Sequence, residues 1–217
     1  MRILILGATG RTGTWALTQA LKNGHEVHVL ARNIQRIDPQ ERLTLIEGDP
    51  SKPESLTHAL ADCEAVISVL NISRTSDFPW APLRTPQTYL SDVMRLLTEL
   101  GEKQGLKRIV TCSAWGVGDS RADIPWWFRW TIDNSNIGIA YQDHTRQEEI
   151  LSASSLDWTI VRPVGLIHAK QPEEIRETFD NHPKPGLLIS RQSVGAYLVD
   201  CLKRDDLIGK KVVVSKK

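Results

Sequence analysis

The sequence predicts an α/β fold of one domain, residues 1–217, in which a mostly parallel, doubly wound sheet carries helices on both faces. Three observations lead to this prediction. Short apolar runs rich in Val, Ile and Leu recur along the chain, as in strands that are buried on both faces. The stretches between these runs are long and periodic enough for helices. A glycine-rich turn follows the first run directly, as in the strand-to-helix connection that opens such a sheet.

Eight apolar runs have strand character and occupy residues 3–6, 26–31, 43–47, 65–69, 108–112, 158–162, 187–189 and 212–214. Between the first two runs, a helix is predicted by the spacing of Trp15, Leu17, Ala20 and Leu21, and it ends at Asn23-Gly24. Strand, helix and strand then form a right-handed βαβ unit. Further helices are expected over 53–60, 87–103, 143–154 and 192–203. Two stretches, 73–86 and 114–139, lack a regular pattern, and such segments after strands usually carry function.

The composition limits the classes of function. With 41% hydrophobic and 24% charged residues, the chain has the composition of a soluble globular protein. Its formal net charge of +1 offers no general field for nucleic acid or an anionic membrane, so neither partner is expected. Cys63, Cys112 and Cys201 are widely spaced, which predicts neither a disulfide framework nor a metal site. The apolar N-terminal run is too short for a signal peptide, and we expect a cytoplasmic protein.

The turn after the first strand indicates a Rossmann-type dinucleotide site. It reads G-x-x-G-x-x-G and opens a helix, where glycines allow a tight turn and close approach of a pyrophosphate to backbone N–H groups. The alternative is a tight turn with incidental glycines. The candidate cofactor residues in this loop are Gly7, Thr9, Gly10, Arg11, Thr12 and Gly13.

Arg32 indicates which dinucleotide is preferred. It follows the second strand, where an NAD site usually presents Asp or Glu to the ribose hydroxyls. A guanidinium binds a 2′-phosphate with charge-assisted bonds, and Arg11 is placed to close on the same phosphate. NADP is therefore expected as the cofactor, with NAD less favoured. The alternative is that both arginines are solvated surface cations.

Further candidates follow the third, fourth and fifth strands, whose carboxyl ends face the same crevice. Asp49 is placed to accept from the adenine amino group, although an Asp before Pro50 is also a common turn element. Ser113 is expected to bind a substrate carbonyl or the nicotinamide carboxamide. Cys112 is expected to point into the core without acting as a nucleophile. The cofactor candidates at these ends are Asp49, Pro50, Val69, Leu70, Asn71, Cys112 and Ser113.

Several segments together resemble a known family. They are the glycine loop, Gly48-Asp49, Ser113, the stretch Glu148-Glu149-Ile150-Leu151, and the stretch 156–163 (Leu-Asp-Trp-Thr-Ile-Val-Arg-Pro). Over nearly the whole chain, the sequence resembles the atypical short-chain dehydrogenase/reductases. Within these it is most similar to the NAD(P)-binding, NmrA-like and flavin reductase (biliverdin reductase B-like) group. The resemblance implies a Rossmann fold that binds NADP and a hydride-transfer site.

The sequence departs from this superfamily at its Tyr-x-x-x-Lys pair. Ala140 stands at the tyrosine position and His144 at the lysine position, while Tyr141 comes one residue late and is rotated by about 100° on a helix. A tyrosine-driven alcohol dehydrogenation is therefore not expected. Ser113 and His144 remain as catalytic candidates, with the proton coming from water or His144. The alternative for His144 is an exposed or helix-capping histidine.

The remaining candidates would enclose the nicotinamide and the substrate. Pro163-Val164-Gly165 would form a wall of the nicotinamide site, or simply a turn. Trp80, Trp115 and Tyr141 are the candidate substrate contacts. The aromatic stretch 126–130 would stack on a flat acceptor, but burial within the protein or at a dimer contact is favoured. A membrane role is less favoured, because the segment is short and lacks a basic polar face.

The favoured function is an NADPH-dependent oxidoreductase that transfers hydride to a flavin, a quinone or a similar planar acceptor such as a linear tetrapyrrole. One alternative is a non-catalytic NADP(H) sensor of the NmrA-like type, which reports to a protein partner. A sugar-nucleotide epimerase or dehydratase is disfavoured by the missing Tyr-x-x-x-Lys pair and by a short C-terminal part. The protein is expected to be a monomer or a homodimer.

Overall fold

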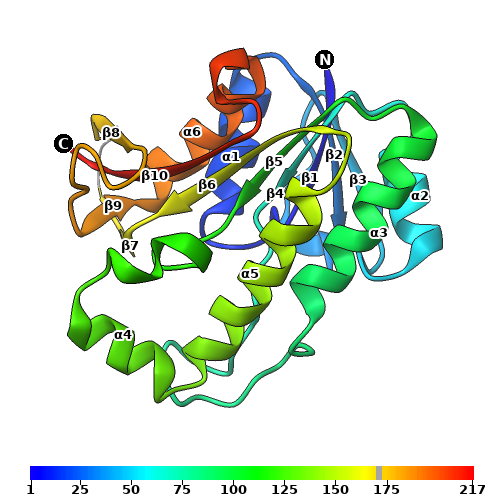
Figure 1. Ribbon diagram of the computed structural model, residues 1–217. Coiled ribbons are helices and arrows are strands. Elements are labelled where there is room, and N and C mark those ends of the chain that lie inside the picture. The colour runs from blue at the N-terminus through cyan, green and yellow to red at the C-terminus, as the bar shows by residue number, and fades with distance from the viewer. Residues whose placement is uncertain (170–172) are drawn as a thin grey trace.

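The computed structural model describes residues 1–169 and 173–217. Its main sheet contains β1 (Arg2–Leu6), β2 (Glu26–Ala31), β3 (Leu43–Glu47), β4 (Ala65–Ser68), β5 (Arg108–Cys112), β6 (Asp157–Pro163), β8 (Ile175–Thr178) and β10 (Lys210–Lys216). The strand order is β3-β2-β1-β4-β5-β6-β10-β8, and β8 alone runs antiparallel to its neighbour (Figure 1). The order reverses beside β1, where β2 and β4 flank it, and ligands of open α/β sheets bind at such a reversal.

Helices cover both faces of the sheet (Figure 1). They are α1 (Gly13–Lys22) and α6 (Arg191–Asp200) on one face, and α2 (Pro53–Leu60), α3 (Tyr89–Gln104) and α5 (Ile137–Ser152) on the other. Successive side chains of a strand point to opposite faces, so Ile3 and Ile5 pack with α1 while Leu4 and Leu6 pack with α2 and α3. The predicted Rossmann-type fold class is confirmed.

The segment 114–139 is more regular than the sequence predicts. It holds a 3-10 turn at Gly118–Ala122 and the helix α4 (Trp126–Asp133), and α5 begins at residue 137 instead of 143. The start of α5 was not predicted because it contains Gly138, and glycine is typical of loops. Its lack of a side chain is needed here, since a Cβ at 138 would lie 2.6 Å from the carbonyl oxygen of Ile132 in α4.

The predicted strand at 187–189 does not join the main sheet. It is β9 (Leu188–Ser190), which pairs with β7 (Gly165–Ile167) in a separate two-stranded sheet. β7 and β8 were not predicted, because each has too few residues for an alternating pattern. The last predicted helix divides into α6 and a 3-10 turn at Cys201–Lys203, and further 3-10 turns lie at Ile34–Arg36 and Asp205–Leu207.

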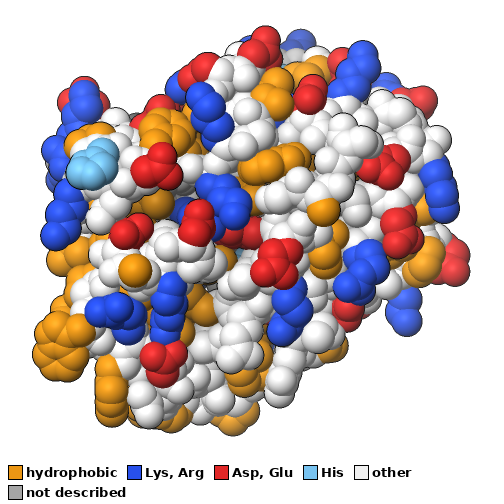
Figure 2. Space-filling view, in the orientation of Figure 1, with side chains coloured by type: hydrophobic (Ala, Val, Ile, Leu, Met, Phe, Trp, Pro, Cys, Tyr) orange, Lys and Arg blue, Asp and Glu red, His pale blue; other side chains and the backbone are white. Residues whose placement is uncertain are grey.

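The predicted burial of the aromatic stretch 126–130 within the chain is wrong. Trp126, Trp127 and Trp130 are 74%, 53% and 57% exposed, and Figure 2 shows hydrophobic side chains on the surface over α4. Phe128 and Ile132 lie four residues apart on one helix face and pack into the core, so the three tryptophans occupy the other faces. Among the described residues, no helix is both long and apolar enough to cross a membrane.

Candidate functional site

A cavity of about 610 Å³ lies at the carboxyl ends of β1, β2, β4 and β5. It brings together most of the predicted site residues, although they come from distant parts of the chain. Those that line it are Gly7, Thr9, Gly10, Arg11, Thr12, Gly13, Arg32, Pro50, Val69, Leu70, Asn71, Cys112, Ser113 and His144. The cavity therefore joins the glycine loop to the two catalytic candidates.

The glycine loop has the backbone that a dinucleotide phosphate needs. Gly7 has a φ of +85°, and a Cβ there would lie 2.7 Å from the carbonyl oxygen of Val69. Glycine is therefore needed here, because the backbone of the loop lies directly against the backbone that follows β4. The Gly10 N–H donates to the carbonyl of Gly7 over 2.9 Å and closes the turn. Within the described residues, no partner is found for the N–H groups of Arg11 and Thr12 just before α1. These groups, with the positive end of the helix dipole, fit a pyrophosphate.

Two arginines stand where a 2′-phosphate would lie. Arg32 follows the last residue of β2, and Arg36 comes from the 3-10 turn just beyond it; both are exposed and line the cavity. A ribose on the neighbouring glycine loop would present its 2′ position to this end of β2. The residues present thus fit a phosphorylated dinucleotide.

Asp49 has a role in the turn before α2. Its Oδ1 accepts from the backbone N–H and the hydroxyl of Ser51, both over 2.9 Å. Burial works to raise the pKa of Asp49, but these bonds and the charge of Arg32 hold that pKa below its ordinary value. Asp49 is not among the lining residues, whereas Pro50 and Tyr89 beside it are. The turn interpretation of Asp49 accounts for its observed bonds.

Ser113 lies at the end of β5 and connects the cavity to a buried ion pair. Its Oγ donates to Oε1 of Glu148 in α5 over 2.6 Å. The Arg162 guanidinium in β6 binds both oxygens of Glu148, with Nε 3.0 Å from Oε1 and Nη2 2.5 Å from Oε2. All three side chains are buried. Glu148 and Arg162 belong to segments that carry the family resemblance, but the sequence did not reveal their link to Ser113.

His144 is buried and neutral. Burial lowers its pKa, against the opposing effects of the Glu148 charge and a hydrogen bond with Gln147. Its Nδ1 lies 3.1 Å from Oε1 of Gln147, whose Nε2 donates to Oγ1 of Thr111 over 2.7 Å. The interpretation of His144 as an exposed residue is wrong, since only 4% of it is accessible.

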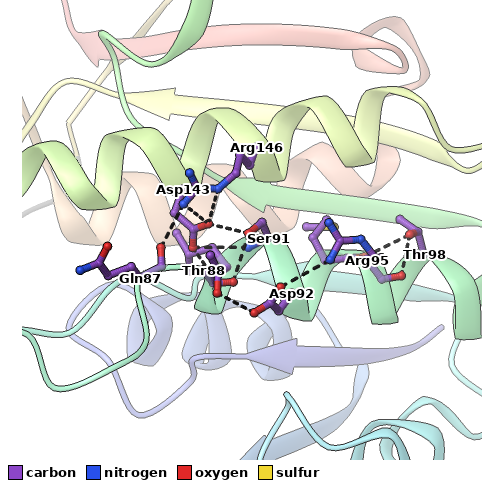
Figure 3. A network of polar contacts seen from close by, with 10 residues as sticks. Gln87, Thr88, Ser91, Asp92, Arg95, Thr98, Asp143 and Arg146 are labelled. Atoms are coloured by element: carbon purple, nitrogen blue, oxygen red, sulfur yellow. Dashed lines mark hydrogen bonds and ion pairs between the residues drawn. The ribbon is translucent and has the colours of Figure 1, made fainter.

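A buried carboxylate fixes the helix that carries His144 and Glu148. Asp143 of α5 accepts from the Leu90 N–H over 2.7 Å and from the Ser91 hydroxyl over 2.6 Å (Figure 3). Leu90 and Ser91 lie in the first turn of α3, so Asp143 caps that helix from a neighbouring one. Arg146 also contacts Asp143 and donates to the carbonyl of Gln87, as Figure 3 shows. The position of α5 is thereby tied to α3.

Arg11 is engaged by a residue that the sequence did not single out. Its Nη1 and Nη2 lie 2.9 and 2.7 Å from the two carboxylate oxygens of Asp77, in the segment 73–86. Arg74 of the same segment and Arg191 at the start of α6 also line the cavity. Burial and the charge of Arg11 lower the pKa of Arg191. The cavity therefore carries a strong excess of positive charge.

The candidate substrate contacts lie outside the lining of this cavity. Trp115 is buried in the core, and the Tyr141 hydroxyl donates to its carbonyl over 3.3 Å. Trp80 is 46% exposed and donates from Nε1 to the carbonyl of Asn134 over 2.6 Å, which joins the segment 73–86 to the end of α4. Pro163-Val164-Gly165 are not in the lining either; the next residue, Leu166, takes that place.

Cys112 lines the cavity with a buried thiol. Burial raises the pKa of its thiol to about 12, and no other cause contributes. The side chain packs into the core, as the sequence analysis expected. Ser113, His144 and the arginines therefore remain the predicted candidates for the chemistry of the cavity.

A family model described as NAD(P)H-binding matches residues 7–205. The chain belongs to this NAD(P)H-binding family. The matched range extends from the glycine loop past α6, so it includes the whole cavity. Membership confirms the predicted resemblance and the dinucleotide cofactor.

Several curated relatives of this family member are longer than the chain. The photosystem II assembly factor Ycf39 of Trieres chinensis is 34% identical over 84% of this chain and 51% of its own length. Its Synechocystis counterpart is 25% identical over 97% of this chain and 61% of its own. The isoflavone reductase homolog A622-like of Nicotiana tabacum is 31% identical, over 35% of this chain and 28% of its own. The chain thus spans less than two thirds of the length of these relatives.

Solved structures share the fold of this NAD(P)H-binding protein. A short-chain dehydrogenase/reductase of Veillonella parvula in complex with NADP superposes with a TM-score of 0.81 at 21% identity, covering 99% of this chain and 94% of that one. ChuY of Escherichia coli O157:H7, named an anaerobillin reductase, has a TM-score of 0.79 at 19% identity, with coverage of 100% and 97%. These similarities support the fold assignment.

Proposed function

We propose that the protein is an NADPH-dependent oxidoreductase that reduces a flavin, a quinone or a similar planar acceptor. The observation that carries this is the single cavity in which the glycine loop, Arg32, Ser113 and His144 meet. Two relatives are named as a reductase or a reductase homologue, which supports the same class. The net reaction is acceptor plus NADPH plus a proton, giving the reduced acceptor and NADP⁺.

The residues of the cavity favour an acceptor that needs no side-chain acid. Bound NADPH supplies the hydride. The Ser113 hydrogen is directed to Glu148, and His144 is neutral, so neither holds a proton for an alkoxide. The tyrosine expected in dehydrogenases is replaced by Ala140 of α5, which packs against the core. Conjugated acceptors spread the negative charge of the transferred hydride, and water supplies their proton.

The choice of NADP over NAD rests on the charge around the adenosine end. Arg32 and Arg36 line the cavity there without an acidic residue from β2 to bind ribose hydroxyls. Charge-assisted bonds to a phosphate contribute more than neutral ones. We therefore propose that the 2′-phosphate of NADPH is bound by these two arginines.

The experiment is oxidation of NADPH by the purified protein, followed optically with and without an added flavin or quinone, with NADH in parallel. Protein-dependent loss of NADPH that needs an acceptor, and a slower loss of NADH, are the expected results. Ser113→Ala is expected to lower kcat more than it weakens NADPH binding. Tight binding without turnover for every acceptor would contradict an enzymatic function.

One observation favours a redox sensor as the second candidate. Arg11 of the glycine loop binds Asp77, so a cofactor that takes Arg11 would break an exposed ion pair with the segment 73–86, which also contacts the end of α4. Cofactor binding would then alter the surface near α4. The assembly-factor names of two relatives agree with a role that involves a protein partner.

A further inference from the structure

The hydrogen of the Ser113 hydroxyl is directed away from the cavity. Its Oγ lies 2.6 Å from Oε1 of Glu148, which belongs to α5 and is not in the lining. A carboxylate only accepts hydrogen bonds, so the single hydroxyl hydrogen must lie between these two oxygens. Both residues are buried, at 6% and 2% exposure, and water does not compete for the bond.

Glu148 lies between two cationic side chains. Arg162 binds both of its oxygens, and the Lys211 ammonium lies 3.8 Å from Oε2. Burial acts to lower the pKa of Arg162, but Glu148 and Asp119 raise it above its ordinary value. A buried carboxylate between two cations stays ionised because protonation would leave those cations uncompensated. The direction of the Ser113 hydrogen bond is therefore fixed.

His144 also presents a hydrogen-bond acceptor to the cavity. Because Nε2 of Gln147 donates to Thr111, its Oε1 faces Nδ1 of His144, and the imidazole hydrogen lies on Nδ1. The lone pair of Nε2 is what this neutral ring has left for a ligand. Ser113 and His144 thus both offer acceptors to the cavity that they line.

We propose that Glu148 is a positioning residue that makes Ser113 a hydrogen-bond acceptor, so that the cavity binds an N–H group at Ser113 and not a carbonyl oxygen. This inference rests on the proposed function, which places a nicotinamide and an acceptor in the cavity. Two ligand groups with the same chemistry can supply this N–H. One is the carboxamide of the nicotinamide, and the other is a ring N–H of a planar acceptor such as a flavin.

The chain offers a matched pair of variants. Glu148 and Asp119 both contact the Arg162 guanidinium, each with an oxygen 2.5 Å from Nη2, but only Glu148 contacts Ser113. Glu148→Gln places an amide beside Ser113, whose N–H₂ can donate to Oγ and free the hydroxyl hydrogen for the cavity. Asp119→Asn makes the same change of charge on the solvent side, where Asp119 is 69% exposed. Ser113→Ala removes the acceptor and leaves the ion pair.

The first arm measures equilibrium binding of NADP⁺ and of its 3-acetylpyridine analogue, in which a methyl ketone replaces the carboxamide. If the carboxamide is the source, wild type and Asp119→Asn prefer NADP⁺ by about tenfold. Glu148→Gln and Ser113→Ala lose that preference. This arm needs no turnover, so it is decided even if the proposed oxidoreductase activity fails.

The second arm compares kcat/KM for a flavin that carries its N3–H and for the 3-methyl derivative. If the acceptor is the source, wild type and Asp119→Asn prefer the N–H form, and Glu148→Gln and Ser113→Ala do not. Should Glu148→Gln not fold, Ser113→Ala still decides whether Ser113 accepts the N–H group. A folded Glu148→Gln that keeps the wild-type preference would overturn the positioning role of Glu148. Equal preferences in wild type and Ser113→Ala in both arms would overturn the inference.

Discussion

Arg11 and Asp77 join the glycine loop to the segment 73–86 through two hydrogen bonds of 2.9 and 2.7 Å between guanidinium and carboxylate. The carboxylate occupies the guanidinium that a cofactor phosphate would use. Under the proposed function, a cofactor phosphate at Arg11 would compete with this anion, which the chain itself supplies. Both side chains are largely exposed, at 56% and 78%, so this competition is weak but present.

Asp77→Asn is expected to tighten NADPH binding by about two- to fivefold, because Arg11 becomes free for phosphate at the modest energy of an exposed ion pair. The gain should shrink at high salt, which screens the pair in the wild type. Calorimetric Kd values for both proteins test this. Asp92→Asn is the control, because Asp92 forms a similar exposed pair with Arg95 on α3. An unchanged Kd for Asp77→Asn would contradict the competition.

Arg32→Ala is expected to weaken NADPH binding by roughly 10- to 100-fold and to leave NADH binding nearly unchanged, because only NADPH carries the 2′-phosphate. Arg36→Ala tests the neighbouring guanidinium and should show a smaller effect in the same direction. The measurement is the ratio of the two Kd values. If Arg32→Ala leaves this ratio at its wild-type value, the proposed phosphate site is wrong.

Much of the sheet was predictable because its signals are local. The runs at 26–31, 43–47 and 108–112 coincide with β2, β3 and β5, and the helix at 53–60 coincides with α2. Doubly buried strands need continuous apolar runs, which the sequence shows directly. Segments whose order depends on contacts, such as α4 with aromatic side chains on several faces, show no such periodicity.

The residues of the candidate site also fall into two groups, those that local patterns predict and those that only the fold brings together. The glycine loop, Arg32 and Ser113 each follow a strand, so the sequence located them near one sheet edge. Asp77 and Arg191 reach the cavity from segments without a motif, and only the folded chain brings them together. The bond between Ser113 and Glu148 also depends on how α5 lies on the sheet, which no local pattern reports.

Asp143→Ala is expected to destabilise the protein by roughly 2–4 kcal/mol, because the buried N–H of Leu90 and the hydroxyl of Ser91 lose their acceptor. For a chain of this size, that lowers the melting temperature by about 2–4 °C per kcal/mol. Asp92→Ala, on the exposed side of the same helix start in Figure 3, is the control and should change far less. Equal melting temperatures for the two variants would show that the buried hydrogen bonds of Asp143 contribute no more to stability than the exposed one of Asp92.

The neutral, buried state of His144 predicts how stability depends on pH. Burial lowers the pKa of His144 in the folded protein below the ordinary value of 6.5, so the unfolded chain binds more protons as the pH falls through that value. Wild type should therefore lose stability on acidification from pH 7.5 to 5.0. His25, buried with a pKa that burial also lowers, contributes in the same direction.

Melting temperatures at both pH values measure this loss of stability. His144→Gln should reduce the loss, because glutamine does not titrate, while His58→Gln, at an exposed position of α2, is the control. A loss as large in His144→Gln as in wild type would mean that folding does not lower the pKa of His144.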